Sequence, residues 1–195
     1  LPALFDGIDA QTYRDFEVVL VDSGSYDRTR EIAVARGARL VRINSQDFTF
    51  GYSLNVGIES ARGTLIVIVS AHTAPVDPYW LERLIDPLQD PAVVMSYGRQ
   101  IGVPDSKFSE VNDFDRFFGP DARDDKPRNI KANNANSAIR KIEWTKKKFN
   151  PLLPGLEDAD WASHWLRRDR RVVYVPEATI RHIHEETWPQ IRRRF

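Results

Sequence analysis

The sequence predicts an α/β fold with a central, mostly parallel sheet flanked by helices, and three observations lead to it. Short runs rich in valine, isoleucine and leucine recur along the first half of the chain, with segments of helical spacing between them. Two of these runs are almost continuously apolar, as in strands that helices cover on both faces. The length of 195 residues suits one domain with a substantial core and is short for two.

The elements follow the chain in order. A first helix is expected from Leu1 to Ala10. Because a sheet of this kind normally starts with a strand, we expect that an N-terminal strand is missing ahead of it. Further strands are expected at 17–21, 39–43, 65–69, 92–97 and 171–175, the apolar runs 17–21 and 65–69 being central.

Helices are expected at 27–36, 52–62, 78–84 and 157–168. Asp27 is a potential N-cap and Gly37 a potential stop for the first of these, and Pro78 suits the first turn of the third. Prolines at 104, 120, 127, 151 and 154, with the charged stretch 121–128, predict long loops and a mobile segment, not a second domain.

Composition limits the classes of partner. Lys plus Arg equals Asp plus Glu at 28 each, which predicts no nucleic-acid binding through a global field. There is no cysteine, which removes thiolate catalysis and Cys-ligated zinc and fits a reducing compartment. No apolar run reaches the roughly 18 residues of a membrane span, so we expect a cytoplasmic domain.

An acid followed by small residues stands at the end of the first apolar run. Asp22, Ser23, Gly24 and Ser25 lie between that strand and the next helix. Ligands bind at this edge of open α/β sheets, where an acid accepts hydrogen bonds from a base or ribose and a glycine lets backbone approach. The alternative is that these residues only cap and turn.

Several segments resemble family 2 glycosyltransferases. The run 21–29 resembles V-D-D-G-S-x-D-x-T, with Ser23 in place of the second acid. Asn55 with Gly57 and the run 61–63 resembles N-x-G-x-x-x-A-x-G, and the run 65–75 followed by Trp80-Leu81 resembles the strand and D-x-D loop that precede P-x-x-W-L. These matches occur in family order.

The resemblance implies a GT-A fold and an inverting enzyme that uses a nucleoside diphosphate sugar donor. It implies a nucleotide-binding half over about 1–100 and an acceptor-binding half over about 101–195, with Asp22, Ser23, Gly24, Ser25 and Asn55 on the donor side. The expected reaction is hexosyl or deoxyhexosyl transfer in cell-surface polysaccharide biosynthesis. The expected acceptor is a glycan or a lipid-linked sugar, with peripheral membrane association.

Ser70, Ala71 and His72 stand where the family's metal-binding D-x-D acids belong. A divalent cation, Mn²⁺ or Mg²⁺, is therefore an open expectation, with His72 and His184 as ligands and His182 as another partner for His72. Imidazole suits Mg²⁺ poorly and a serine hydroxyl is a weak ligand. His72 could instead donate to the diphosphate or be a loop histidine, and Arg99 and Lys131 are alternative sources of positive charge.

The segment 133–141 resembles the family's G-x-N-x-x-x-R stretch at the boundary of donor sugar and acceptor. Asn134 and Asn136 are the expected sugar contacts, since carboxamides both donate to and accept from hydroxyls. The alternative is that these asparagines cap a helix.

Glu157, Asp158 and Trp161 follow in the next motif. The family's E-D pair maps the general base onto Asp158, which would take the proton of the attacking hydroxyl. Glu157 and Trp161 are expected near the sugars. The alternative is that the acids only favour a helix N-terminus. A glycosyltransferase-like domain that binds without turnover, and a sugar nucleotidyltransferase, are the competing functions.

Overall fold

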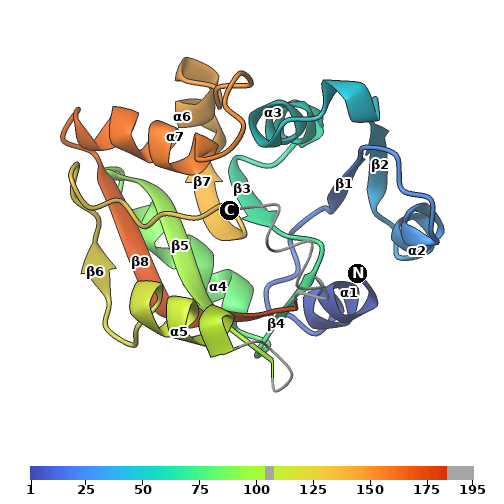
Figure 1. Ribbon diagram of the computed structural model, residues 1–195, viewed down its shortest axis with the longest axis horizontal. Helices are drawn as coiled ribbons and strands as arrows, with labels where there is room; N and C mark the ends of the chain where they lie inside the picture. The colour runs from blue at the N-terminus through green and yellow to red at the C-terminus, as the bar shows by residue number, and fades with distance from the viewer. Residues whose placement is uncertain (104–107, 184–195) are drawn as a thin grey trace.

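The computed structural model describes residues 1–103 and 108–183 and contains two sheets (Figure 1). Strands β1 (Val19–Asp22) and β2 (Arg39–Arg42) pair with each other. The larger sheet has the order β3-β7-β5-β8-β4, and β6 pairs with β8 off this path. Its strands are β3 (Leu65–Val69), β4 (Thr73–Pro75), β5 (Val93–Ile101), β6 (Arg123–Asp124), β7 (Asn136–Arg140) and β8 (Arg171–His182).

The α/β class is confirmed, but the sheet is mixed and not mostly parallel. β1 with β2 and β5 with β8 run parallel. β7 is antiparallel to both β3 and β5, and β8 is antiparallel to β4 and β6. The sequence-based expectation failed because the strand β7 lies in the asparagine segment, which its motif marked as a ligand segment and not as a strand.

Two apolar runs, 17–21 and 65–69, were expected to form central strands. In the described structure each of their strands pairs with one other strand only. β3 pairs only with β7 there, and β1 only with β2. The middle of the larger sheet is instead formed by β7, β5 and β8. An apolar run reports that both faces of a strand are covered, and it carries no information on whether both edges are paired.

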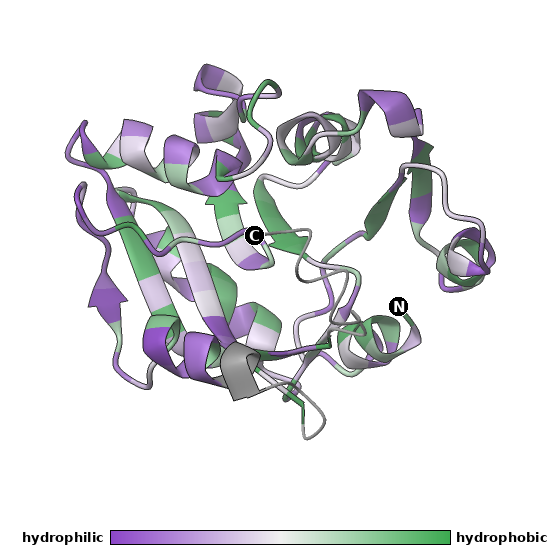
Figure 2. Cartoon of the chain, viewed as in Figure 1, coloured by the Kyte–Doolittle hydropathy of each residue, from purple (hydrophilic) through white to green (hydrophobic). Residues whose placement is uncertain are grey.

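Helices cover the larger sheet on both faces. Helices α3 (Phe50–Ser60), α6 (Lys141–Lys146) and α7 (Glu157–Leu166) supply Ile58, Trp144, Trp161 and Trp165 to one buried cluster. Helix α4 (Trp80–Ile85) supplies Trp80, Leu81 and Leu84 to a second cluster. Figure 2 shows the apolar strands between these layers. Each fully buried large apolar side chain contributes about 1.5–3 kcal/mol.

A third, smaller cluster joins the N-terminal helix to the two-stranded sheet. Phe5 of α1 (Pro2–Asp9) packs with Ala33 of α2 (Thr29–Ala35) and Ala38. The expected N-cap Asp27 is wrong by one residue: Arg28 is the N-cap of α2, although the Asp27 carboxylate accepts the Thr29 N–H at 3.0 Å. Helix α3 begins earlier than expected, because the Thr49 hydroxyl caps it by accepting the Tyr52 N–H.

The second half of the chain contains more regular structure than the loops expected there. Helix α5 (Phe108–Phe117) lies along the lower side of the sheet in Figure 1, and the strands β6 and β7 follow it. Two short 3-10 helices, η1 (Ser45–Asp47) and η2 (Asp86–Gln89), complete the elements of the described residues. Within those residues, no helix is long and apolar enough to cross a membrane.

Candidate functional site

Asp22 ends β1 and is held in a tight turn. Its carboxylate accepts the Ser25 N–H at 3.1 Å and lies 3.8 Å from the Arg30 Nε. Gly24 makes this turn with a φ of 110°, a backbone conformation that residues with a side chain rarely adopt. Burial opposes ionisation, but the hydrogen bonds from Ser25 and Gly24 and the charge of Arg30 lower the pKa of Asp22 below its usual value.

Ser70, Ala71 and His72 form the turn between β3 and β4. The Ser70 carbonyl accepts the Thr73 N–H at 3.2 Å, and the Ser70 hydroxyl lies 3.0 Å from His72 Nδ1. The His72 carbonyl accepts the Ile183 N–H at 2.9 Å, which fastens this turn to the chain after β8. The turn is therefore fixed, while the side chains of Ala71 and His72 are exposed.

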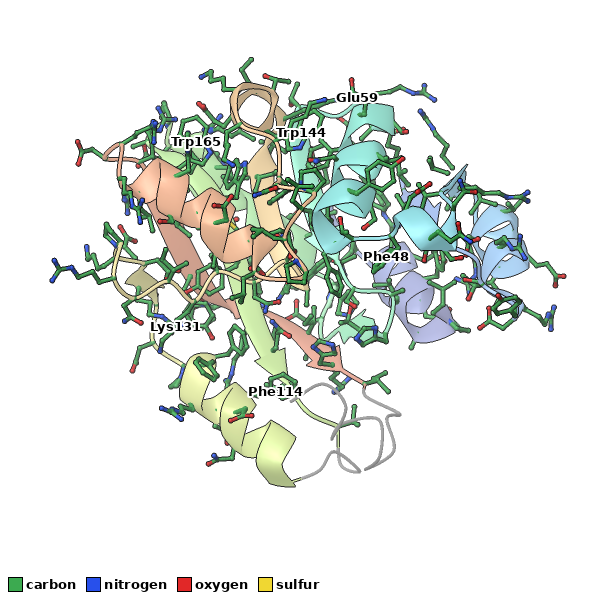
Figure 3. All side chains as sticks on the ribbon, turned by 45° about the horizontal axis from the view of Figure 1, so that its top comes forward. Phe48, Glu59, Phe114, Lys131, Trp144 and Trp165 are labelled. Atoms are coloured by element: carbon green, nitrogen blue, oxygen red, sulfur yellow. The ribbon has the colours of Figure 1, made fainter. Side chains whose placement is uncertain are left out.

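His182, at the end of β8, is the neighbour of His72. The two rings are 4.7 Å apart between centroids, and His182 Nδ1 lies 2.7 Å from the Gln100 Oε1. Phe114 also stacks on His182, at 5.7 Å between ring centroids, and Figure 3 shows Phe114 on the side of α5 that faces the end of β8. His182, named as a possible partner of His72, is thus a buried member of an aromatic stack.

The described residues do not fit a divalent-cation site. Neither Ser70 nor Ala71 brings a carboxylate, and Mg²⁺ and Mn²⁺ prefer oxygen ligands. Within residues 1–103 and 108–183, no three His, Asp or Glu side chains come together as a ligand set. The predicted ligand His184 lies outside the described residues. We therefore derive no step through a metal ion.

Asn134 joins the asparagine segment to the two acids that begin α7. Its backbone N–H donates to Asp158 Oδ2 at 3.1 Å, and its side-chain Nδ2 donates to Glu157 Oε1 at 3.1 Å. The Asn134 Oδ1 accepts the Ser137 hydroxyl at 3.0 Å. The second Asp158 oxygen, Oδ1, accepts the Ala159 N–H at 2.7 Å. The expected sugar-binding asparagine and the expected base are therefore direct neighbours.

The two acids hold protons more tightly than free carboxylic acids do. Burial raises the pKa of Asp158, and the hydrogen bonds from Asn134 and Ala159 offset part of that effect. Burial, followed by the charge of Asp158, raises the pKa of Glu157, against the hydrogen bond from Asn134. Asp158 is half-buried, and Glu157 is 6% exposed. A raised pKa brings a carboxylate closer to the value that suits a general base at neutral pH.

A backbone hydrogen bond connects the serine-histidine turn to the asparagine segment. The Ser70 N–H donates to the Ala135 carbonyl at 3.2 Å, immediately after Asn134. The turn expected on the donor side and the acids expected to act on the acceptor are thus linked through two consecutive residues, Asn134 and Ala135. The side chain of Asp22, by contrast, contacts its own turn and Arg30 of α2, and its carbonyl accepts the N–H of Ile43, just after β2.

The structure gives Asn136 a core role in place of the expected sugar contact. Its Oδ1 accepts the Trp80 Nε1–H at 2.9 Å, and its Nδ2 donates to the carbonyls of Arg99 at 3.1 Å and Ala178 at 2.8 Å. The residue is 0% exposed. A Cβ on Gly98 would collide with this amide and with the Ala178 carbonyl, so Gly98 leaves the space for it.

Trp161 and Asn55, also expected to contact ligands, hydrogen-bond within the protein. Trp161 is 0% exposed and donates to the Lys147 carbonyl at 2.6 Å, so it offers no face to a sugar. Asn55 donates to the Phe149 carbonyl at 2.8 Å and accepts the Trp144 Nε1–H at 2.9 Å, which ties α3 to α6. Trp161 is buried and Asn55 is half-buried, and neither of these structural roles could be predicted from the residue type.

The two cations suggested for the diphosphate lie in different settings. Arg99 is half-buried near the end of β5, and its Nε has no hydrogen-bond partner among the described residues. The Lys131 Nζ lies 5.9 Å from the centroid of the Phe117 ring, in the connection that precedes β7 (Figure 3). Sequence reasoning missed Asp125, which lay in a stretch interpreted as a charged loop but is 3% exposed.

The fold is that of GT-A glycosyltransferases. The mannosyltransferase PcManGT of Pyrobaculum calidifontis, solved in complex with GDP-Man and Mn²⁺, has a similar structure with a TM-score of 0.67. That likeness has 19% identity and covers 91% of this chain and 51% of the other. Residues 1–149 match the family described as Glycosyl transferase family 2. The chain therefore belongs to glycosyl transferase family 2.

Two curated relatives are similar over different extents. An O-antigen chain rhamnosyltransferase, RfbN of Salmonella typhimurium, is 24% identical over 197 residues, which cover 95% of this chain and 63% of the relative. A PGL/p-HBAD biosynthesis glycosyltransferase of Mycobacterium bovis is 40% identical over 88 residues, 43% of this chain and 34% of the relative. The matched parts thus span about a third and somewhat under two thirds of the length of these two relatives.

Proposed function

We propose that this chain transfers a sugar from a nucleoside diphosphate sugar to an acceptor hydroxyl with inversion, and that Asp158 is the general base. The observation that carries the proposal is the Asp158 carboxylate itself, half-buried, raised in pKa and held by the Asn134 N–H. Each of its oxygens accepts one backbone hydrogen bond within the described residues, which leaves lone pairs for an acceptor hydroxyl.

In the proposed reaction the acceptor oxygen attacks the anomeric carbon from the side opposite the leaving group. Asp158 takes the hydroxyl proton as the new glycosidic bond forms. The bond between the anomeric carbon and the diphosphate breaks, and its electron pair leaves with the nucleoside diphosphate. Inversion follows from this single displacement, and base catalysis of this kind contributes roughly 10²- to 10⁴-fold in rate.

We assign the nucleotide to the Asp22 turn. The lowered pKa keeps the Asp22 carboxylate charged and able to accept hydrogen bonds from ribose or base hydrogens. Ser23, Gly24 and Ser25 would supply small polar groups and close backbone approach beside it. The exposed His72 would lie toward the diphosphate, with Arg99 as a further source of positive charge as the leaving group departs.

The sugar and acceptor classes rest on the relatives. One relative is named a rhamnosyltransferase and one structural neighbour a mannosyltransferase, which favours a hexosyl or deoxyhexosyl donor. The O-antigen in the first name favours a glycan or lipid-linked acceptor in polysaccharide biosynthesis. Residues 101–195 would then contribute most of the acceptor side, and peripheral association with a membrane stays a prediction.

The test is a transfer assay with a panel of nucleotide sugars, run with and without Mn²⁺. We expect sugar transfer or slow donor hydrolysis with at least one nucleotide sugar, and loss of that turnover in Asp158→Asn. Calorimetric binding of the same nucleotides is measured in parallel. Nucleotide binding without any turnover under all metal conditions would replace the proposal with a domain that binds but does not catalyse.

A further inference from the structure

Asp125 is a buried carboxylate that the reaction outlined above does not use. It is 3% exposed and follows directly after β6, where its N–H donates to the Val172 carbonyl at 2.9 Å. No Lys, Arg or His side chain lies within ion-pair distance of it among the described residues. A buried carboxylate without a cationic partner must be compensated by hydrogen bonds.

Three hydrogen bonds reach the Asp125 carboxylate from two directions. Oδ1 accepts the Tyr97 hydroxyl of β5 at 2.6 Å. Oδ2 accepts the backbone N–H of Lys131 at 2.7 Å and that of Ala132 at 3.0 Å. One oxygen therefore faces the core strand, and the other holds two consecutive peptide units of the connection that leads to β7. Hydrogen bonds to an ionised acceptor are roughly twice as strong as neutral ones.

Those two peptide units stand directly before the asparagine segment. Asn134, whose N–H donates to Asp158, is two residues beyond Ala132. Between Asp125 and Lys131 the connection is closed by the pair of backbone hydrogen bonds that join Lys126 and Asn129. Fixing the direction of two peptide N–H groups leaves few conformations for a chain of two further residues.

We propose that Asp125 is a positioning residue for the general base, acting through the backbone of residues 131–134. Its Oδ2 holds the connection so that the Asn134 N–H meets the Asp158 carboxylate. The effect that this inference predicts on turnover rests on the proposed function. The geometric claim, that removing Asp125 disturbs the Asp158 carboxylate, is separate from it and is tested without an activity assay.

The groups that act on Asp158 set the sign of the expected effect. Burial raises the pKa of Asp158, and the Asn134 and Ala159 N–H groups oppose this because they favour its ionised carboxylate. The adjacent titratable group is Glu157, whose own pKa the charge of Asp158 raises. Loss of the Asn134 hydrogen bond removes the largest of the hydrogen-bond contributions that oppose burial. The pKa of Asp158 should therefore rise further when Asp125 no longer holds the connection.

The experiment follows the Asp158 side-chain carboxyl by ¹³C NMR titration, with the resonance assigned by its absence in Asp158→Asn. In Asp125→Ala we expect titration at higher pH than in the wild type. Asp125→Asn keeps an amide oxygen that can accept both N–H groups, so it should restore the wild-type titration. Tyr97→Phe is the matched control, because it removes a hydrogen bond to the same carboxylate and leaves the two backbone bonds in place.

An unchanged Asp158 titration in Asp125→Ala, or an equal shift in Tyr97→Phe, would overturn the proposal. If Asp125→Ala does not fold, the comparison is made between Tyr97→Phe and Tyr97→Phe/Asp125→Ala, in which one fewer polar group is stranded.

Turnover supplies the second readout. Asp125→Ala should lower kcat by roughly 10- to 100-fold, as for a displacement of about 1 Å at a reacting group, with donor affinity unchanged. Full turnover in Asp158→Asn would instead reject the general base and leave the titration result standing.

Discussion

Asp22 and Asp158 are the same amino acid in two opposite settings. Asp22 lies at the end of β1, in a turn whose N–H groups and the nearby Arg30 lower its pKa. Asp158 lies in the first turn of α7, where burial dominates and raises its pKa although two N–H groups donate to it. Hydrogen bonds are present at both carboxylates. At Asp22 they outweigh burial with a smaller contribution from Arg30, whereas at Asp158 burial outweighs them.

The opposite pKa directions suit the two carboxylates to two different functions. A carboxylate that stays charged serves as a fixed acceptor for a ligand, whereas one whose pKa is raised exchanges a proton more readily near neutral pH. The two regions also differ in how they are held. The Asp22 turn hydrogen-bonds locally, whereas the Asp158 region is tied to β3 and the sheet core through residues 133–136.

Glycine substitutions should separate the two regions by stability first. Gly98→Ala places a Cβ against the Ala178 carbonyl and the Asn136 amide, so it should lower the free energy of unfolding by about 3 kcal/mol. Gly24→Ala meets only Ser45 at 3.6 Å, and its cost arises from the φ of 110° and should be about 1 kcal/mol. Urea unfolding of both variants measures this, and equal losses would show that the two regions are not held differently.

The pH dependence of stability should sharpen the comparison through Glu157. Its folded-state pKa is raised by burial and by Asp158, so the folded protein binds this proton more tightly than the unfolded chain does. That contribution to stability is present below the unfolded pKa and is lost as pH rises through the folded pKa.

Gln cannot titrate and still accepts from Asn134, so Glu157→Gln should gain stability relative to the wild type between pH 4 and pH 7. Denaturant unfolding at the two values measures the gain. A relative loss over that interval would contradict the assignment of Glu157 as a destabilised carboxylate.

Relief of backbone strain at Leu156, just before the Glu157-Asp158 pair, gives the smallest expected change in the free energy of unfolding. The Asp22 turn uses a glycine for its positive φ, whereas the residue before Glu157 is Leu156 with a φ of 62°. Leu156→Gly should raise the free energy of unfolding by about 0.5 kcal/mol, because the strain of roughly 1 kcal/mol or more exceeds the added entropy of glycine. Asp169→Gly, at a φ of 59°, is the control and should gain less, since aspartate tolerates this conformation.

The fold could be predicted from the order of the motifs, because each motif marks the end of a strand or the start of a helix. The strand expected at 65–69 is found at Leu65–Val69, and the helix expected from 157 begins at Glu157. Neighbours in the sheet could not be predicted in this way. The strand Asn136–Arg140 lies between β3 and β5, and its pairing depends on contacts between segments far apart in the chain.

The candidate site was predictable where a motif carried chemistry and unpredictable where burial decided the role. Asn134 and Asp158 were each named from a motif, and the structure places them in direct contact, which neither motif predicted. Asn55, Asn136 and Trp161 have side chains suited to sugars, yet each hydrogen-bonds within the protein. Asp125 had no motif, and only the path of the connection brings two N–H groups to its carboxylate.

The most direct test of two separate carboxylate roles compares Asp158→Asn with Asp22→Asn in one experiment. Single-turnover transfer rates at saturating donor and donor dissociation constants are measured for both. Asp158→Asn should lower the rate by roughly 10²-fold or more with donor affinity within a factor of about two. Asp22→Asn should weaken donor binding about tenfold and change the saturated rate little. Equal losses of rate and affinity in the two variants would contradict the account.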